Sequence, residues 1–136
     1  MAQMTERMME LFNTVRTVVL STSTEDGVPN AVPVGMKRIL DNETILISNQ
    51  YLNKTLSNMQ SNSQIAVTFW EGREGYQLKG RAVVETVGCR YEETAAWISE
   101  VSAKTGRPMR SKGAVILTIE EIYSVAPGPG AGKRIS

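Results

Sequence analysis

The sequence contains no histidine and a single cysteine, Cys89. The absence of histidine removes the commonest general base, the Ser/His and Cys/His nucleophile pairs, and the commonest transition-metal ligand. A lone cysteine excludes an intrachain disulfide and a thiolate metal cluster. Any chemistry that this chain performs is therefore expected to come from a bound cofactor.

The chain also lacks an excess of charge of either sign and a long hydrophobic run. Its 15 basic and 14 acidic residues leave a net charge of +1, so no global field favours nucleic acid or a membrane surface. No apolar run approaches the roughly 20 residues that span a bilayer. The first residues, MAQMTERMMELF, include acidic side chains and lack the basic start and cleavage site of a signal peptide. We therefore expect a cytoplasmic protein with no nucleic-acid or membrane partner.

What is present is the composition of a folded domain. The 136 residues are 41% hydrophobic and 21% charged, which is enough for one core and predicts a single domain over residues 1–136. Hydrophobic periodicity predicts helices over 5–13, with Thr5 as the N-cap, from 54 onward and over about 90–104. It predicts six strands, over 15–23, 28–40, 44–48, 65–70, 76–87 and 114–125. Because most strands lack a crossover helix between them, we expect a mainly β (α+β) fold, a small antiparallel barrel with peripheral helices.

Residues 44–59, TILISNQYLNKTLSNM, form the most informative stretch. An apolar alternating strand ends in polar Ser48 and Asn49, and a short turn leads to Lys54 and Thr55 at the start of a helical pattern. Backbone N–H groups at a helix start, with a lysine and a hydroxyl beside them, form a phosphate site. The same elements also make an ordinary helix cap on a surface turn, so both interpretations stand at this point.

Two other features have simpler interpretations. The segment GPGAGKR resembles a nucleotide phosphate loop, but that motif requires glycine at Pro127 and serine or threonine at Arg134. We expect residues 126–136 to form an irregular C-terminal arm that packs on a partner subunit or ligand, or is disordered. Cys89 lies at the entry to the third helix, and we expect a buried, inert thiol rather than a reactive thiolate.

The order of these motifs resembles the pyridoxamine 5′-phosphate oxidase-like FMN-binding split-barrel superfamily. The similarity runs from about residue 5 to residue 123 and includes the hairpin, the proline-broken strand, the Ser48-Asn49 and Lys54-Thr55 steps, and the strand GYQLKGRAV. It is greatest with the short single-domain members. The resemblance implies a six-stranded antiparallel split β-barrel with Greek-key topology.

The resemblance also implies a homodimer with one FMN per subunit, held where the subunits meet. It assigns cofactor binding to Val32, Pro33, Val34, Lys37, Ser48, Asn49, Lys54, Thr55 and Gln77. In this assignment Lys54 and Thr55 bind the phosphate, the proline-broken strand backs the flavin ring, and Gln77 lies at the ring edge. No residue of the chain is assigned as catalytic and no metal is expected.

Departures from the family pattern limit the expected activity. Pyridoxamine phosphate oxidases carry an arginine near the position of Val32 and a longer C-terminal region with arginine and histidine residues that hold the substrate. This chain has neither, although Lys37 matches a lysine near the substrate phosphate. The resemblance therefore implies an FMN-dependent oxidoreductase that reduces a small molecule or a protein redox partner, without pyridoxamine phosphate oxidase activity.

Three alternatives remain open from the sequence. The same fold binds a deazaflavin cofactor in some superfamily relatives. A non-enzymatic flavin carrier or sensor would use the same site without turnover. A cofactor-free barrel acting as a binding module belongs to a different class, and the colour of the purified protein distinguishes it from the others.

Overall fold

The part of the chain that the structure describes folds into ten helices and strands. A computed structural model describes residues 2–136. The elements are α1 (Glu6–Thr14), β1 (Val18–Ser23), β2 (Pro29–Val34), β3 (Lys37–Asp41), β4 (Thr44–Asn49), α2 (Lys54–Ser61), β5 (Gln64–Glu71), β6 (Glu74–Glu85), α3 (Cys89–Thr105) and β7 (Gly113–Ser124). The sequence-based bounds of the three helices and most strands agree within a few residues.

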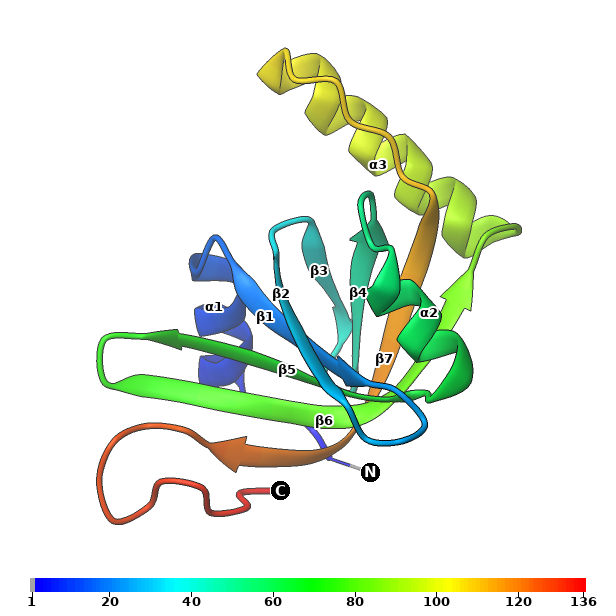
Figure 1. The fold of residues 1–136 in the computed structure, drawn as a ribbon. Coiled ribbons are helices and arrows are strands. Elements are labelled where there is room, and N and C mark those ends of the chain that lie inside the picture. Colours follow the sequence, from blue (N-terminus) through cyan, green and yellow to red (C-terminus); the bar gives the residue numbers. More distant parts are fainter. Residues whose placement is uncertain (1) are drawn as a thin grey trace.

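The strands form one antiparallel sheet that curls into a half-barrel (Figure 1). Its order is β2-β1-β5-β6-β7-β4-β3, with seven strands. The long strands β6 and β7 pair along most of their length, and a register shift between Lys79 and Gly80 bends β6. At this shift the strands approach so closely that a Cβ on Gly80 would lie 1.9 Å from the Thr118 carbonyl oxygen. The expectation of a mainly β split barrel is confirmed.

The prediction of one strand over residues 28–40 is wrong, and the sheet has seven strands rather than six. Pro29 and Pro33 belong to β2, which pairs only with β1 at one edge of the sheet. After a break at Gly35 and Met36, β3 pairs with β4 at the opposite edge. Proline is tolerated in β2 because an edge strand leaves one row of N–H groups unpaired. The break lets the chain cross the open side of the half-barrel.

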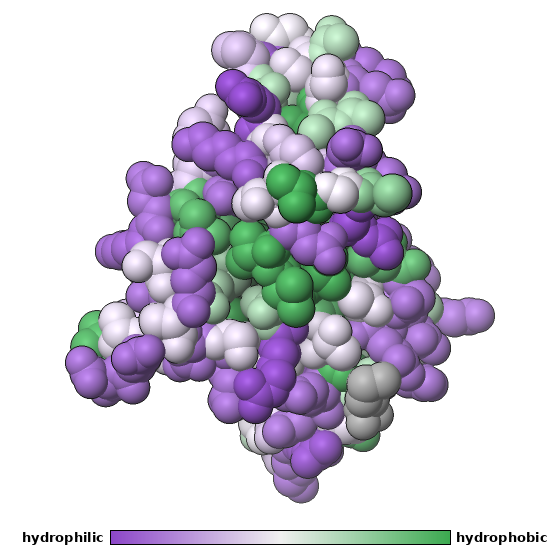
Figure 2. All heavy atoms as spheres, turned by 90° about the vertical axis from the view of Figure 1, so that its right-hand side faces the viewer, coloured by the Kyte–Doolittle hydropathy of each residue, from purple (hydrophilic) through white to green (hydrophobic). Residues whose placement is uncertain are grey.

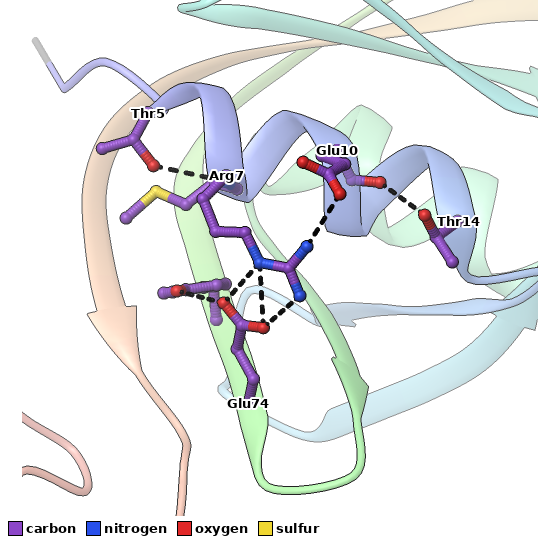
Figure 3. Close-up of polar contacts among 7 residues, drawn as sticks. Thr5, Arg7, Glu10, Thr14 and Glu74 are labelled. Atoms are coloured by element: carbon purple, nitrogen blue, oxygen red, sulfur yellow. Dashed lines mark hydrogen bonds and ion pairs between the residues drawn. The ribbon is translucent and has the colours of Figure 1, made fainter.

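The core fills the concave side of the sheet and extends under α1. Phe12 on α1 is fully buried and meets Phe69 of β5 edge to face, with ring centroids 5.4 Å apart. Thr5 caps α1 as predicted, because its Oγ1 accepts a hydrogen bond from the Met8 N–H. Figure 3 shows Arg7 of α1 between Glu10 and Glu74, the first residue of β6. This ion pair joins α1 to the β5–β6 hairpin.

The long helix α3 projects from the end of the half-barrel (Figure 1). Only Thr94 and Ile98 are buried along it. Gly106 ends the helix in a left-handed conformation with φ 73°, which glycine adopts at low cost. The prediction that Cys89 is buried is wrong, since the first residue of α3 is exposed. The helix begins beyond the sheet, so no core surface covers its first turn.

The end of the chain is better ordered than the sequence indicated. After a turn, the backbone of residues 132–136 returns along β7, and Arg134 forms a bridge with Tyr123. The GKR residues therefore pair with a strand and do not form a phosphate loop. Within residues 2–136, no helix has the length and apolar character needed to cross a membrane. The same residues contain no cluster of three or more potential metal-binding side chains.

Candidate functional site

A cavity of about 850 Å³ is lined by residues at one end of the half-barrel, by Val101 of α3, and by Arg107 and Met109 after it. The links α1–β1, β2–β3 and β4–α2 all reach this end (Figure 1), and their residues line the cavity together with β2 and residues 107–109 after α3. This volume is within the range of cofactor pockets, and such sites favour the mouths of barrels. Because four segments far apart in the sequence contribute, the cavity depends on the tertiary fold.

The cavity gathers most of the residues predicted to bind a cofactor. Those that line it are Val32, Pro33, Val34, Lys37, Ser48, Lys54 and Thr55. Two others do not. Asn49 is buried beside it, and Gln77 lies half-buried in β6 between Thr68 and Tyr123. Gln77 is therefore at a different part of the sheet, and the structure does not place it at a ring edge in this cavity.

The turn from β4 into α2 keeps the elements of an anion site. The residue before α2, Asn53, makes no side-chain cap, so the first N–H groups of the helix have no side-chain partner. Lys54 is exposed at the cavity and makes no ion pair among the described residues. Asn49 is used internally, since its Oδ1 accepts a hydrogen bond from the Leu52 N–H at 3.1 Å. Lys54 and the helix start thus remain available, whereas Asn49 shapes the turn.

Thr55 is held by a buried polar network. Its Oγ1 accepts a hydrogen bond at 3.0 Å from Asn30 Nδ2, which also donates to Thr22 Oγ1. Asn58 Nδ2 donates to the same Thr22 oxygen at 3.1 Å. Because Thr55 Oγ1 already accepts a hydrogen bond, its own O–H is left as a donor beside the cavity. Asn30 therefore holds the Thr55 hydroxyl in place at the cavity.

Lys37 has a different position from the one expected of a phosphate ligand. Its Nζ donates a hydrogen bond at 2.6 Å to the Phe12 carbonyl oxygen and lies 4.5 Å from the centroid of the Phe12 ring. Carbonyl groups at a helix C-terminus attract a cation, and Phe12 is in the last turn of α1. Burial lowers the pKa of Lys37. Lys37 therefore closes the α1 end of the cavity and its ammonium is committed to that helix.

Gln50 is a site residue that the sequence did not indicate. It lines the cavity immediately after β4, and its buried Nε2 has no hydrogen-bond partner among the described residues. A buried amide without a partner costs free energy, and such groups in a folded protein call for an explanation. Gln50 lines the cavity, so rotation of its side chain would bring this amide to an acceptor on a ligand. The nearest signal in the sequence was the polar Ser48-Asn49 strand end.

The wall opposite these donors is apolar. Val32 and Val34 of β2 are half-buried and pack against the core, while Pro33 between them points outward and is exposed. Ser48 is buried at the end of β4, and its Oγ donates to Ser111 Oγ at 2.8 Å. Ser111 in turn donates to the Gly113 carbonyl oxygen. These two hydrogen bonds join the start of β7 to the end of β4. The cavity therefore has an apolar wall formed by Val32 and Val34 and a polar wall at the β4–α2 turn.

Two arginines complete the charge of the cavity. Arg16, in the α1–β1 link, and Arg107, after α3, line it together with Lys37 and Lys54. No aspartate or glutamate contributes to the lining. Neither arginine was predicted as a site residue, because they are 91 positions apart and neither lies in a recognisable motif. Four cationic side chains without a carboxylate favour an anionic ligand.

Residues 4–126 match the family model described as pyridoxamine 5′-phosphate oxidase, and the chain belongs to this family. An uncharacterised protein of Methanocaldococcus jannaschii is 36% identical over 122 residues, which is 88% of this chain and 79% of the relative. The crystal structure of HupZ from Group A Streptococcus is 27% identical and has a TM-score of 0.80, covering 95% of this chain and 99% of HupZ. The family and the split-barrel fold are therefore established.

More distant solved structures share the fold, but their names refer to different ligands: FMN, F420 and heme. An FMN-binding protein from Syntrophomonas wolfei has a TM-score of 0.75 at 14% identity, covering 88% of this chain and 84% of that one. An F420 reductase has a TM-score of 0.63 at 12% identity, covering 83% and 93%. The heme storage protein HutZ from Vibrio cholerae also has a TM-score of 0.63, at 14% identity, covering 90% and 95%. The fold alone therefore does not select one ligand.

Proposed function

We propose that this protein binds FMN and acts as an oxidoreductase that passes electrons from reduced flavin to a small acceptor or a redox partner. The observation that carries the proposal is the cavity itself, which joins an uncapped helix start, a free lysine and an orphaned amide to an apolar wall. A flavin mononucleotide has matching parts: a dianionic phosphate, a polar chain and a flat apolar ring with polar edges.

Each part of the site has a role in this proposal. Lys54, the α2 N–H groups and the Thr55 hydroxyl bind the phosphate. Val32 and Val34 pack against one face of the ring, and Gln50 donates to an acceptor on the ligand. FMN supplies the reversible electron transfer that no side chain of this chain can perform. The protein contributes binding, orientation and restricted access of water.

The residues around the cavity argue against pyridoxamine phosphate oxidase activity. Val32 stands where those enzymes are expected to carry an arginine, and the Lys37 ammonium is bonded to the Phe12 carbonyl oxygen. Arg16 and Arg107 supply positive charge from other segments. We therefore expect a different acceptor.

We also propose that the protein is cytoplasmic and works as a homodimer with the flavin near the subunit contact. Figure 2 shows apolar side chains gathered in the middle of one face, below the projecting end of α3, with hydrophilic side chains around them. An apolar patch with a polar rim is typical of a protein interface. Tyr51, in the cavity lining, is 78% exposed in the single chain, which is consistent with burial by a second copy.

A deazaflavin remains the second candidate cofactor, because an F420 reductase shares the fold and the cavity is large enough for a flavin-sized ring system. A flavin carrier or sensor would use the same residues without turnover. Steady-state turnover with a nicotinamide donor and an artificial acceptor favours the enzyme. Its absence in FMN-loaded protein favours the carrier.

The first experiment is the absorption spectrum of freshly purified protein, followed by titration of the flavin-free protein with FMN and with a deazaflavin. We expect a flavin spectrum and tighter binding of FMN. Lys54→Ala removes a charge-assisted contact worth about 1.5–3 kcal/mol, so FMN affinity should fall roughly 10- to 100-fold. Lys104→Ala, at an exposed lysine of α3 outside the cavity, is the matched control. Equal affinity of all three proteins, or no FMN binding, would refute the proposal.

A further inference from the structure

The cavity holds more positive charge than one phosphate requires. Lys54 and the start of α2 suffice for a dianion, and the Lys37 ammonium is already bonded to the Phe12 carbonyl oxygen. Arg16 and Arg107 are then left over. Both are exposed at the cavity, and neither makes an ion pair among the described residues.

The arginine after α3 is held in place by its backbone. Ser102 Oγ donates to the Arg107 carbonyl oxygen at 2.7 Å and accepts from the Met109 N–H at 3.1 Å. Gly106 fixes the turn between them. The guanidinium therefore extends from an anchored turn beside the cavity rather than from a free loop.

The region around Arg107 reinforces the positive field. Between Glu100 and Glu120 the sequence contains no acidic residue, whereas it contains Lys104, Arg107, Arg110 and Lys112. Arg16, which also lines the cavity, lies two residues after the end of α1. Interaction with the α1 dipole is one role for Arg16, but Lys37 already bonds to a carbonyl in the last turn of that helix.

We propose that Arg16 and Arg107 form a second anion subsite, which binds a carboxylate, sulfonate or phosphate group on the small acceptor. Guanidinium groups bind such planar or tetrahedral oxyanions through paired N–H donors, which a lysine does not do. The apolar Val101 and Met109 beside Arg107 would contact the body of the acceptor. This inference rests on the proposed flavin function and adds the substrate class: a small anion with an apolar body.

A pair of electron acceptors that differ in one charged group tests this subsite. FMN-loaded protein is reduced with stoichiometric dithionite under anaerobic conditions and mixed with 1,4-naphthoquinone or 1,4-naphthoquinone-2-sulfonate. Each quinone takes two electrons and two protons from reduced FMN, giving a hydroquinone and oxidised FMN. The measured quantity is the second-order rate constant of flavin reoxidation for each acceptor, as a function of salt.

We expect Arg16→Gln and Arg107→Gln each to lower the rate constant for the sulfonate about tenfold, as the loss of a charge-assisted hydrogen bond predicts. The rate constant for the neutral quinone and the Kd for FMN should change less than about twofold. Salt should slow only the sulfonate reaction. Arg110→Gln, in the same segment but outside the lining, controls for the general field, and Arg73→Gln in the distant β5–β6 turn controls for net charge.

Direct binding separates this proposal from the flavin proposal. The affinity of flavin-free protein for 1-naphthalenesulfonate, compared with neutral 1-naphthalenemethanol, is measured by calorimetry in the same variants. Preference for the sulfonate that disappears with Arg16 or Arg107 supports the subsite even where FMN fails to bind. The proposal is overturned if the two cavity variants lower the rate constant equally for both quinones, or if they lose FMN affinity. It is also overturned if Arg110→Gln has the same effect as the cavity variants.

Discussion

Charged side chains at the β5–β6 hairpin form ion pairs, whereas the charged side chains that line the cavity are all positive. At the hairpin, Arg7 of α1 lies between Glu74 and Glu10, with its Nε 3.1 Å from Glu74 Oε1, and Tyr76 donates to the same carboxylate (Figure 3). At the cavity, Arg16, Lys54 and Arg107 line the wall without a carboxylate, and the Lys37 ammonium is bonded to the Phe12 carbonyl oxygen. Both ends belong to the same sheet and are joined by the same core.

The polar groups differ in the same way as the charges. Near the hairpin, Phe12, Phe69 and Tyr76 pack together and leave no buried side-chain polar atom without a partner among the described residues. At the cavity, Gln50 has a buried donor without a partner. The polar groups of the hairpin end thus have partners within the protein, whereas the cavity end keeps unsatisfied groups, as ligand sites do.

The largest expected effect is on stability and leaves the cavity lining intact. Gly80→Ala places a Cβ 1.9 Å from the Thr118 carbonyl oxygen and 2.9 Å from Leu117 Cδ1. Because a backbone atom of a paired strand cannot move aside, we expect the free energy of unfolding to fall by about 3 kcal/mol or more. Urea denaturation measures it. Gly130→Ala, where a Cβ meets nothing within 4 Å, should change it by less than about 0.5 kcal/mol; equal stability of the two variants would contradict the packing argument.

The second largest effect is expected at Thr55, where a substitution should lower both the unfolding free energy and the affinity for FMN. Thr55→Val removes the acceptor of Asn30 Nδ2 and the donor beside the cavity. Asn30 keeps its contact with Thr22, so we expect a loss of about 1 kcal/mol in unfolding free energy and about a tenfold loss of FMN affinity. Denaturation and FMN titration are measured on the same samples. Thr55→Ser restores the hydroxyl and should recover most of the affinity; failure to do so would remove the proposed donor role.

A substitution at Gln50 should move stability and binding in opposite directions. Gln50→Leu removes the orphaned Nε2, so we expect the flavin-free protein to gain about 1 kcal/mol in unfolding free energy. FMN affinity should fall, because the ligand loses a donor. Thermal unfolding with and without FMN measures both quantities. Gln60→Leu, at an exposed position of α2, is the control. A variant that loses stability would show that Gln50 has a structural role.

The smallest effect concerns the hairpin in acid. Glu74 accepts hydrogen bonds from Arg7 and Tyr76. Both lower the pKa of Glu74 below its ordinary value of 4.5, and the bond from Arg7 has the larger effect. The unfolded chain then binds more protons than the folded protein between the two pKa values, so stability present above about pH 4.5 is lost as the pH falls through the folded pKa. Glu74→Gln should flatten this part of the stability–pH curve slightly, because exposed pairs contribute little. An unchanged slope would mean that the ion pair is too weak to matter.

Features that depend on a few neighbouring residues were predicted from the sequence, and features that depend on where an element lies in the sheet were not. The Thr5 cap, the Lys54-Thr55 helix start and the β-rich antiparallel fold were predicted, because each depends on local periodicity or on a few neighbouring residues. The burial of Cys89 and a single strand over 28–40 were wrong. Both errors concern where an element ends relative to the sheet, which a local pattern does not contain.

By itself, the sequence determined the kinds of element and excluded histidine chemistry, an intrachain disulfide and a thiolate metal cluster, because composition and alternation are properties of the chain alone. The tertiary structure decided which residues share a cavity. Strands β2 and β3 are consecutive but lie at opposite edges of the sheet, and the curl of that sheet brings Arg16, Gln50 and Arg107 to one place. It also turned Lys37 toward α1 and left Gln77 on a distant part of β6. Convergence of this kind depends on strand order and curvature, which arise only when the whole core is packed.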